Sequence, residues 1–231
     1  MRRSFWFVVI ASLFVTCLIT ANIIAVKLIG VFGFLVPAGI IIFPLSYLFG
    51  DVLTEVYGYA AAREVIWLGF LCNLLAVVAI ALGGLAPAAP FWQNQGAYET
   101  ILGFTPRLLL ASFMAYLAGE FTNSFILAKV KIATKGRWLW MRTISSTLVG
   151  EGLDTTIFIS IAFWGIIPPA MVLTTIGTQW TLKVLYEVIA TPFTYAVVGF
   201  LKRREQLDTY DVQTNFSPLL LRRPSPDHEA L

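Results

Sequence analysis

Long apolar runs, each close to the length that crosses a lipid bilayer, alternate with short polar segments along most of the chain. Cutting the sequence at its charges, prolines and glycines leaves six runs, at 5–26, 36–57, 64–86, 106–129, 140–166 and 171–201. A helix needs about 20 apolar residues to cross the roughly 30 Å of hydrocarbon in a bilayer. The pattern therefore predicts an all-α polytopic membrane protein, with six transmembrane helices in a domain at 1–201 and a cytoplasmic polar tail at 202–231.

Composition supports a membrane protein and excludes several other classes. Of the 231 residues, 58% are hydrophobic and 13% are charged, whereas charged residues make up about 25% of soluble domains. Such a chain is too apolar for a soluble enzyme, a disordered protein or an outer-membrane barrel. The net charge of +3 gives no reason to expect a nucleic-acid partner. Because Cys17 and Cys72 lie in apolar runs and His228 lies in the tail, we expect no disulfide, metal site or cofactor.

Lysine and arginine are distributed unevenly between alternate connecting segments. If the N-terminus is cytoplasmic, most of them fall on the inward side, while the outward loops hold Lys27 and Arg107. This asymmetry follows the positive-inside rule for an even number of helices. It predicts a multi-pass protein of the cell inner (plasma) membrane with both termini in the cytoplasm. The first run is expected to be retained, because no clean signal-peptide cleavage site follows it.

Seven ionisable residues fall inside the predicted spans. They are Asp51, Glu55, Glu120, Glu151, Asp154, Lys183 and Glu187. Each costs about 2.5 to 3.5 kcal/mol at the bilayer centre, and the sum of roughly 20 kcal/mol exceeds the ~5 to 15 kcal/mol that keeps a typical domain folded. These side chains must therefore face an interior that contains water, ions or a ligand.

The spacing of the polar residues places them on shared helix faces, because residues three or four apart are neighbours on a helix. The four resulting stripes are Phe43, Tyr47, Asp51 and Glu55; Ser112, Tyr116, Glu120 and Asn123; Arg142, Ser146, Gly150 and Asp154 with Thr147 and Glu151 beside them; and Gln179, Lys183 and Glu187. A structural alternative pairs Lys183 with Glu187, and Arg142 with Asp154 or Glu151. Since carboxylates outnumber cations, the whole set favours a site for a positive or hydrogen-bond-donating solute.

Two further patterns bear on mechanism. Ser46-x-Leu48-x-Gly50-Asp51-x-Leu53 recurs one hundred residues later as Ser146-x-Leu148-x-Gly150-Glu151-x-Leu153. With three helices per half, a true repeat would be inverted, an arrangement that builds central sites in many transporters. Pro44 and Pro192 lie inside predicted helices, where each is either a packed kink or a break that frees a carbonyl for a ligand.

The chemistry of these residues suits a flat, nitrogen-rich solute. Carboxylates, the amides of Asn22 and Asn123, and aromatic side chains would line a pocket in which one carboxylate accepts both hydrogen bonds from the amino-imino edge of a guanine-like base. The faces of the base would stack on aromatic rings, and Arg142 or Lys183 would meet a carbonyl. A cationic amine remains open as an alternative, because the same carboxylates would bind it.

The stretch from Phe43 to Gly58, FPLSYLFGDVLTEVYG, followed by Arg63 and Trp67, resembles the signature of the YhhQ-type queuosine-precursor transporters, formerly called the putative vitamin uptake family. Further similar positions are Ala111-Ser112-Phe113-Met114-Ala115-Tyr116, Leu139-Trp140-x-Arg142, Ser146-Thr147, Asp154 and Ile161-Ala162-Phe163-Trp164. The resemblance covers about 21–202.

This resemblance implies a six-helix inner-membrane carrier, not an enzyme, that imports 7-cyano-7-deazaguanine (preQ0) for queuosine modification of tRNA. It leaves open the preference among preQ0, its 7-aminomethyl relative preQ1 and queuine. Carried over, it implies a site around Asp51, Glu55, Glu120, Arg142, Glu151, Asp154 and Lys183. Glu120 and Glu151 depart from the pattern, because amides are expected there in some relatives, and this departure bears on base preference and pH dependence.

Together, these arguments give one set of candidate substrate-binding residues. They are Asn22, Phe43, Tyr47, Asp51, Glu55, Tyr116, Glu120, Asn123, Arg142, Ser146, Glu151, Asp154, Lys183 and Glu187. We expect substrate to bind between two three-helix halves that rock about it. A proton shared by Asp51 and Glu55, which are one turn apart, leaves proton coupling open.

Two other functions and the question of partners stay open from the sequence. A substrate-binding subunit of an energy-coupling-factor importer would need ATPase partners, and the sequence holds no phosphate loop of its own. An intramembrane aspartyl protease would use two carboxylates, but Leu48 replaces the first glycine of its usual Gly-x-Gly-Asp signature. The preferred interpretation requires a 7-deazapurine substrate and the lipid bilayer but no ATPase, and its small-residue helix faces permit a homodimer.

Overall fold

The computed structural model describes residues 4–31, 34–103, 106–165 and 168–220, so His228 lies outside the described residues. Within these ranges the regular elements are helices and one short β-hairpin, joined by loops. In chain order the elements are α1 (Phe5–Ile24), β1 (Leu28–Val31), β2 (Phe34–Pro37), the 3-10 helix η1 (Ala38–Ile41), α2 (Phe43–Tyr57), α3 (Tyr59–Leu85), α4 (Gln95–Leu102), α5 (Pro106–Ala133), α6 (Leu139–Phe163) and α7 (Pro169–Glu205).

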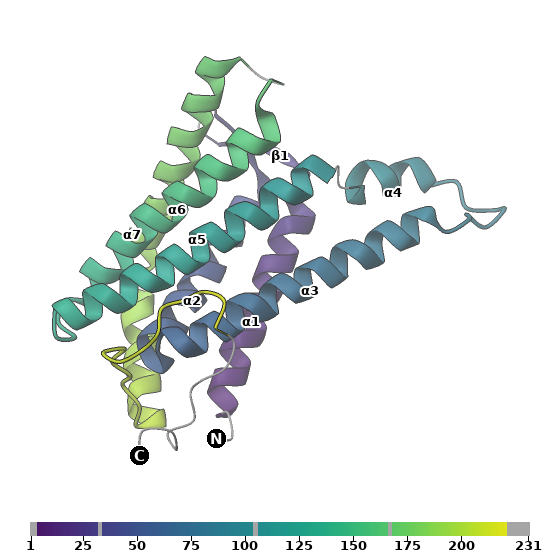
Figure 1. The fold of residues 1–231 in the computed structure, drawn as a ribbon. Coiled ribbons are helices and arrows are strands. Elements are labelled where there is room, and N and C mark those ends of the chain that lie inside the picture. Colours follow the sequence, from purple (N-terminus) through teal and green to yellow (C-terminus); the bar gives the residue numbers. More distant parts are fainter. Residues whose placement is uncertain (1–3, 32–33, 104–105, 166–167, 221–231) are drawn as a thin grey trace.

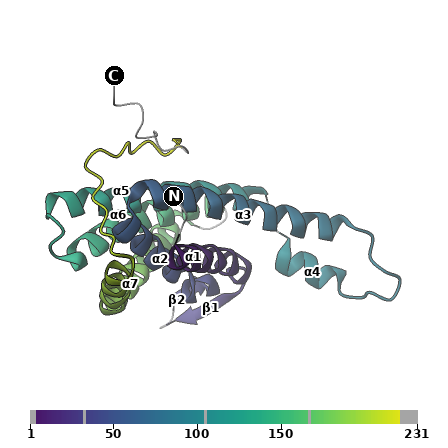
Figure 2. The same ribbon diagram turned by 90° about the horizontal axis from the view of Figure 1, so that it is seen from below.

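The long helices form one bundle in which the start of α1 and the end of α7 lie on the same side. Figure 1 shows the start of α1, the end of α7 and the connection between α2 and α3 at one end, and the hairpin, the end of α6 and the start of α7 at the other. The hairpin is antiparallel, with Leu28 opposite Pro37. The far end of α3 and the short α4 project away from the other helices (Figure 2). We refer to the two ends as the terminal end and the hairpin end.

The helix α2 lies at the centre of the bundle. It contacts α1, α3, α5 and α7, and 12 of its 15 residues are buried, Asp51 and Glu55 among them. By contrast, α3 and α7 expose large apolar side chains such as Leu75 and Ile189, as helices that face lipid do. The carboxylates of α2 are thus turned inward, while α3 and α7 turn large apolar side chains outward.

Close approach of α5 and α6 depends on two glycines. These helices form the most extensive pair in the bundle. A Cβ atom at Gly119 would lie 3.2 Å from the carbonyl oxygen of Gly150, and one at Gly150 would lie 3.0 Å from that of Gly119. Small residues let helix backbones come this close in membranes, and the contact brings Glu120 and Asn123 of α5 beside Glu151 and Asp154 of α6.

Among the described residues, three helices are long and apolar enough to cross a membrane, namely α1, α3 and α7 from Met171 onward. The protein is therefore a helical membrane protein. Helix bounds differ from the expected runs by a few residues at most helix ends, and two differences are larger. Residues 28–31 and 34–37 form the hairpin and 38–41 form η1, so α2 begins at Phe43, and the expected outer loop contains α4.

The structure corrects one expectation and confirms another about proline. Pro44 lies in the first turn of α2, where its missing N–H would have no intrahelical partner. It therefore frees no carbonyl within the helix, and the proposed break there is wrong. Pro192 does lie inside α7, as the sequence indicated.

Candidate functional site

A cavity of about 400 Å³ opens at the hairpin end of the bundle. Residues at its outer end, including Val26 and Gly103, are exposed, whereas Ala115 and Lys183 at its inner end are buried. Its wall holds the aromatic side chains of Phe113 and Phe158. Five of the residues predicted from sequence line it, namely Asn22, Phe43, Tyr116, Asp154 and Lys183.

The floor of the cavity is an ion-pair triad. The Nζ atom of Lys183 lies 2.7 Å from Oε2 of Glu151 and 2.7 Å from Oδ2 of Asp154, and 4.5 Å from the centre of the Phe43 ring. All three charged residues are buried. Lys183 therefore pairs across helices with α6, and not with Glu187 along its own helix.

Amides and hydroxyls form a second polar group in the wall. The side-chain amide of Asn22 donates to Oδ1 of Asn73 at 3.1 Å, and Ser112 donates to Oδ1 of Asn22 at 3.4 Å. The Tyr116 hydroxyl donates to the carbonyl of Ile66 at 2.8 Å. The sequence analysis missed Asn73, although a single amide in the very apolar α3 was a signal that could have identified it.

Behind the cavity lies a cluster of buried polar groups that we call the central acidic cluster, comprising Asp51, Glu120 and Glu187. Asn123 donates to Oδ1 of Asp51 at 2.6 Å, and Tyr47 is buried nearby against α5. None of these five predicted residues lines the cavity. Several of their polar atoms have no hydrogen-bond partner: Tyr47 Oη, Asp51 Oδ2, both carboxylate oxygens of Glu120, Asn123 Oδ1 and Glu187 Oε1.

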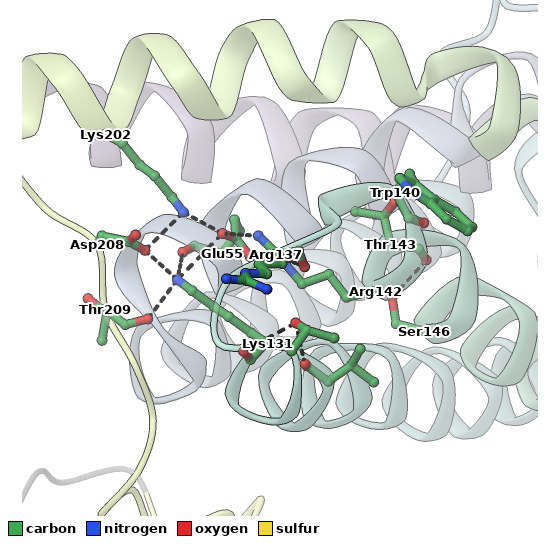
Figure 3. A network of polar contacts seen from close by, with 12 residues as sticks. Glu55, Lys131, Arg137, Trp140, Arg142, Thr143, Ser146, Lys202, Asp208 and Thr209 are labelled. Atoms are coloured by element: carbon green, nitrogen blue, oxygen red, sulfur yellow. Dashed lines mark hydrogen bonds and ion pairs between the residues drawn. The ribbon is translucent and has the colours of Figure 1, made fainter.

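The remaining predicted residues, Glu55, Arg142 and Ser146, lie toward the terminal end (Figure 3). Arg142 donates to both oxygens of Glu55, from Nε at 2.7 Å and from Nη2 at 2.8 Å. This bidentate pair replaces the pairing of Arg142 with Asp154 or Glu151 that the sequence left open. Ser146 donates to the carbonyl of Thr143 at 2.9 Å. Asp51 and Glu55, one turn apart, thus belong to different polar networks.

Glu55 is the hub of a larger network, which we call the terminal-end network. Lys202 lies 2.5 Å and Lys131 3.5 Å from Oε1 of Glu55. Both lysines also reach Oδ1 of Asp208, at 2.9 Å and 2.6 Å respectively. With Arg142, three positive and two negative side chains therefore close this end of the bundle (Figure 3).

Asp208 belongs to a segment after α7 that folds back over the bundle, which we call the strap (208–218). The strap carbonyls of Asn215 and Ser217 accept hydrogen bonds from Arg63 at 2.9 Å and 2.8 Å. The ring of Phe216 packs against Tyr59, with ring centres 4.9 Å apart. The start of the expected polar tail is therefore bound to α3.

The electrostatics of the strap follow from its lysine partners. Burial raises the pKa of Asp208, but hydrogen bonds from Lys131 and Lys202 outweigh burial and hold this pKa below its ordinary value. Asp208 therefore stays ionised at neutral pH and binds the strap to the bundle electrostatically.

Comparison with known proteins gives consistent matches. Residues 37–197 match the family described as "Putative vitamin uptake transporter". A "Probable queuosine precursor transporter" of Bacillus subtilis (strain 168) is 31% identical over 191 residues, which is 81% of this chain and 82% of the relative. The "Queuosine precursor transporter" of Escherichia coli (strain K12) is 31% identical over 164 residues, covering 71% of this chain and 70% of the relative. No solved structure matches the chain significantly.

Proposed function

We propose, on the premise that the chain belongs to the family described as "Putative vitamin uptake transporter", that it imports 7-cyano-7-deazaguanine for queuosine modification of tRNA, with the 7-aminomethyl relative as a second substrate. Membership of this family makes the protein a transporter and not an enzyme. The named relatives support a queuosine precursor as the transported class, and the cavity supports the choice of a flat deazapurine.

The cavity at the hairpin end is the observation that carries this proposal. Its volume of about 400 Å³ lies within the roughly 300 to 1,000 Å³ typical of small-molecule sites. A carboxylate of the floor, Asp154, would accept the two hydrogen bonds from the amino-imino edge of the base. Lys183 would donate to its carbonyl, and the rings of Phe43 and Phe158 would cover its faces. Glu151 would hold Lys183 in position from the side away from the cavity.

Six helices are proposed to span the membrane. Besides α1, α3 and α7, the 28 residues of α5 and the 25 residues of α6 are long enough to cross, and their polar side chains are buried in the bundle. The 15 residues of α2 and the four of η1 together span about 30 Å, the thickness of the hydrocarbon layer. The recurrence of Gly50-Asp51 at Gly150-Glu151 in the sequence supports two inverted halves.

The terminal end is proposed to face the cytoplasm of an inner-membrane protein. It carries Lys131, Arg142 and Lys202, and the positive-inside rule places such charges inside. In this orientation the cavity faces outward while the terminal-end network closes the cytoplasmic side. Alternating access would then require this network to open, with Glu55 and Arg142 acting on release of the substrate and not on its recognition.

Restoration of queuosine in tRNA tests the proposal directly. Cells that cannot make 7-cyano-7-deazaguanine are given a trace of it, with this gene as the only addition, and tRNA queuosine is measured. The wild-type chain should restore the modification, Asp154→Asn should abolish it, and the matched control Glu99→Gln, on the exposed α4, should behave as wild type. Absence of queuosine with verified membrane insertion of the wild-type chain would refute self-sufficient import.

A further inference from the structure

The central acidic cluster is separate from the substrate cavity and holds more negative charge than its surroundings can balance. Asp51 and Glu120 are 0% exposed and Glu187 is 2% exposed. The carboxyl groups of Glu187 and Glu120 lie close enough to Asp51 to repel its charge. Neither oxygen of Glu120 has a hydrogen-bond partner, and one oxygen each of Asp51 and Glu187 also lacks one.

Two neutral polar side chains beside this cluster each have one atom without a hydrogen-bond partner. The Tyr47 hydroxyl is buried, with the residue 1% exposed, and would lie 2.4 Å from a Cβ atom at Gly119, next to Glu120. Asn123 is 0% exposed and donates to Asp51, but its own carbonyl oxygen has no partner. A buried amide oxygen and hydroxyl left unpaired each cost free energy. Both groups are suited to a hydrogen bond with a protonated carboxyl group.

Among the described residues no cation forms an ion pair with Asp51, Glu120 or Glu187. Lys183 is committed to Glu151 and Asp154. The cations of the terminal-end network are committed to Glu55 and Asp208. In the described part of the chain no three His, Cys, Asp or Glu side chains have the geometry to hold a metal ion. Three buried, unpaired carboxylates would each cost several kcal/mol, and protonation removes that cost.

We propose that the central acidic cluster binds a transported proton, with Glu120 as its carrier, and that proton entry drives substrate import. This inference rests on the proposed transport function. Glu120 takes up a proton as a carboxylic acid when the cavity is open to the outside and releases it as a carboxylate to the cytoplasm. Each cycle then moves one proton together with one substrate molecule, and no covalent bond to the substrate changes.

The position of Glu120 explains how the two sites communicate. The titratable and charged groups facing it are Tyr47 and Asp51 from α2, Tyr116 from α5, Glu151 and Asp154 from α6, and Lys183 from α7. Glu187 of α7 faces Asp51 and Glu151. Asp154 and Lys183 also line the cavity. A base that binds Asp154 therefore changes the electrostatic potential at Glu120. In turn, the charge on Glu120 changes the affinity of the cavity for the base.

The test uses the purified full-length protein in liposomes that contain a trapped pH dye, with potassium and valinomycin holding the membrane potential at zero. Adding 7-cyano-7-deazaguanine outside at equal pH should acidify the interior. With the interior one pH unit more alkaline, one proton per molecule should drive accumulation of labelled substrate up to about tenfold. Counterflow, the exchange of labelled for trapped unlabelled substrate at equal pH, reports transport itself and needs no gradient.

Glu120→Gln should lose acidification and the tenfold accumulation, because the amide cannot carry a proton. Glu99→Gln, the same change at an exposed position, should keep acidification, accumulation and counterflow. Counterflow by the wild-type protein without acidification or accumulation would overturn the inference and leave the transport function standing. Absence of wild-type counterflow would instead refute the proposed function. The wild-type measurement depends on no variant, so it can overturn the proposal even if the Glu120→Gln protein fails to fold.

Discussion

Replacing Glu55 with glutamine perturbs the terminal-end network at its hub. The Glu55 carboxylate accepts hydrogen bonds from Arg142 and Lys202 and lies 3.5 Å from Lys131, with its side chain 1% exposed. A glutamine keeps the shape but offers one acceptor oxygen and turns an N–H₂ donor toward three cations. The network would pass from three positive and two negative charges to three positive and one negative.

The cost of this change follows from burial. Removing one partner of a buried ion pair typically costs about 3 to 5 kcal/mol, and we take the lower end because the Lys202 side chain is 23% exposed and can reach water. At roughly 2 to 4 °C per kcal/mol for a chain of this size, Glu55→Gln should lower the Tm by about 6 to 12 °C. Thermal unfolding of the purified protein in detergent measures this shift.

Arg142→Gln provides the comparison that tests the charge argument. It removes one positive charge and leaves a network of two lysines balanced against Glu55 and Asp208. It should therefore cost less than Glu55→Gln, because Glu55 keeps two lysine partners. Equal losses of stability for the two variants would refute the idea that this network holds the terminal end closed. The same conclusion would follow if Glu55→Gln, like the exposed control Glu99→Gln, lost no stability.

Three further predictions concern the cavity, the helix contact and the strap. Lys183→Met leaves two buried carboxylates without their cation and should reduce substrate uptake at least tenfold, whereas Lys135→Met at an exposed loop position should not reduce it. Gly119→Ala places a Cβ atom 2.4 Å from a tyrosine hydroxyl and should destabilise the protein by about 1 to 3 kcal/mol, while Gly177→Ala, with open space around it, should be neutral in the same melting assay. Because the pKa of Asp208 is lowered in the folded protein, its contribution to strap binding should be constant between pH 6 and 8 and be lost only as the pH falls below its ordinary value. The rate of protease cleavage of the strap should follow that pH profile. Asp208→Asn removes an interaction that contributes at most about 1 kcal/mol at this partly exposed site. It should therefore raise the cleavage rate about fivefold at neutral pH and remove the acid dependence of cleavage.

Sequence periodicity predicted the helical membrane protein and the inward polar faces, because both follow from the cost of exposing the wrong side chain to lipid. The same cost explains why α2, α5 and α6 are not among the helices that are long and apolar enough to cross a membrane by length and composition. The bundle-facing stripes of α5 and α6 are polar, and α2 is shortened by the hairpin before Phe43. The hairpin itself was missed because its strands, such as 34–37, are as apolar as the spans on either side.

Pairing between helices was not predictable, since a shared face on one helix does not identify the helix opposite. Asp51 and Glu55 lie on one stripe of α2, yet Asn123 of α5 binds the first and Arg142 of α6 binds the second. The fifth member of the terminal-end network, Asp208, comes from a segment whose composition indicated only a polar tail.

The resulting division of charge has a mechanical consequence. At the terminal end the buried Glu55 has three cations within 4 Å, so opening that end requires several charge-assisted bonds to break together. In the central acidic cluster the carboxylates lack such partners, so adding or removing one proton there changes the electrostatic energy strongly while breaking few bonds. A cycle that opens the terminal end therefore needs an input of free energy, and the unpaired cluster is where the smallest chemical change can supply it.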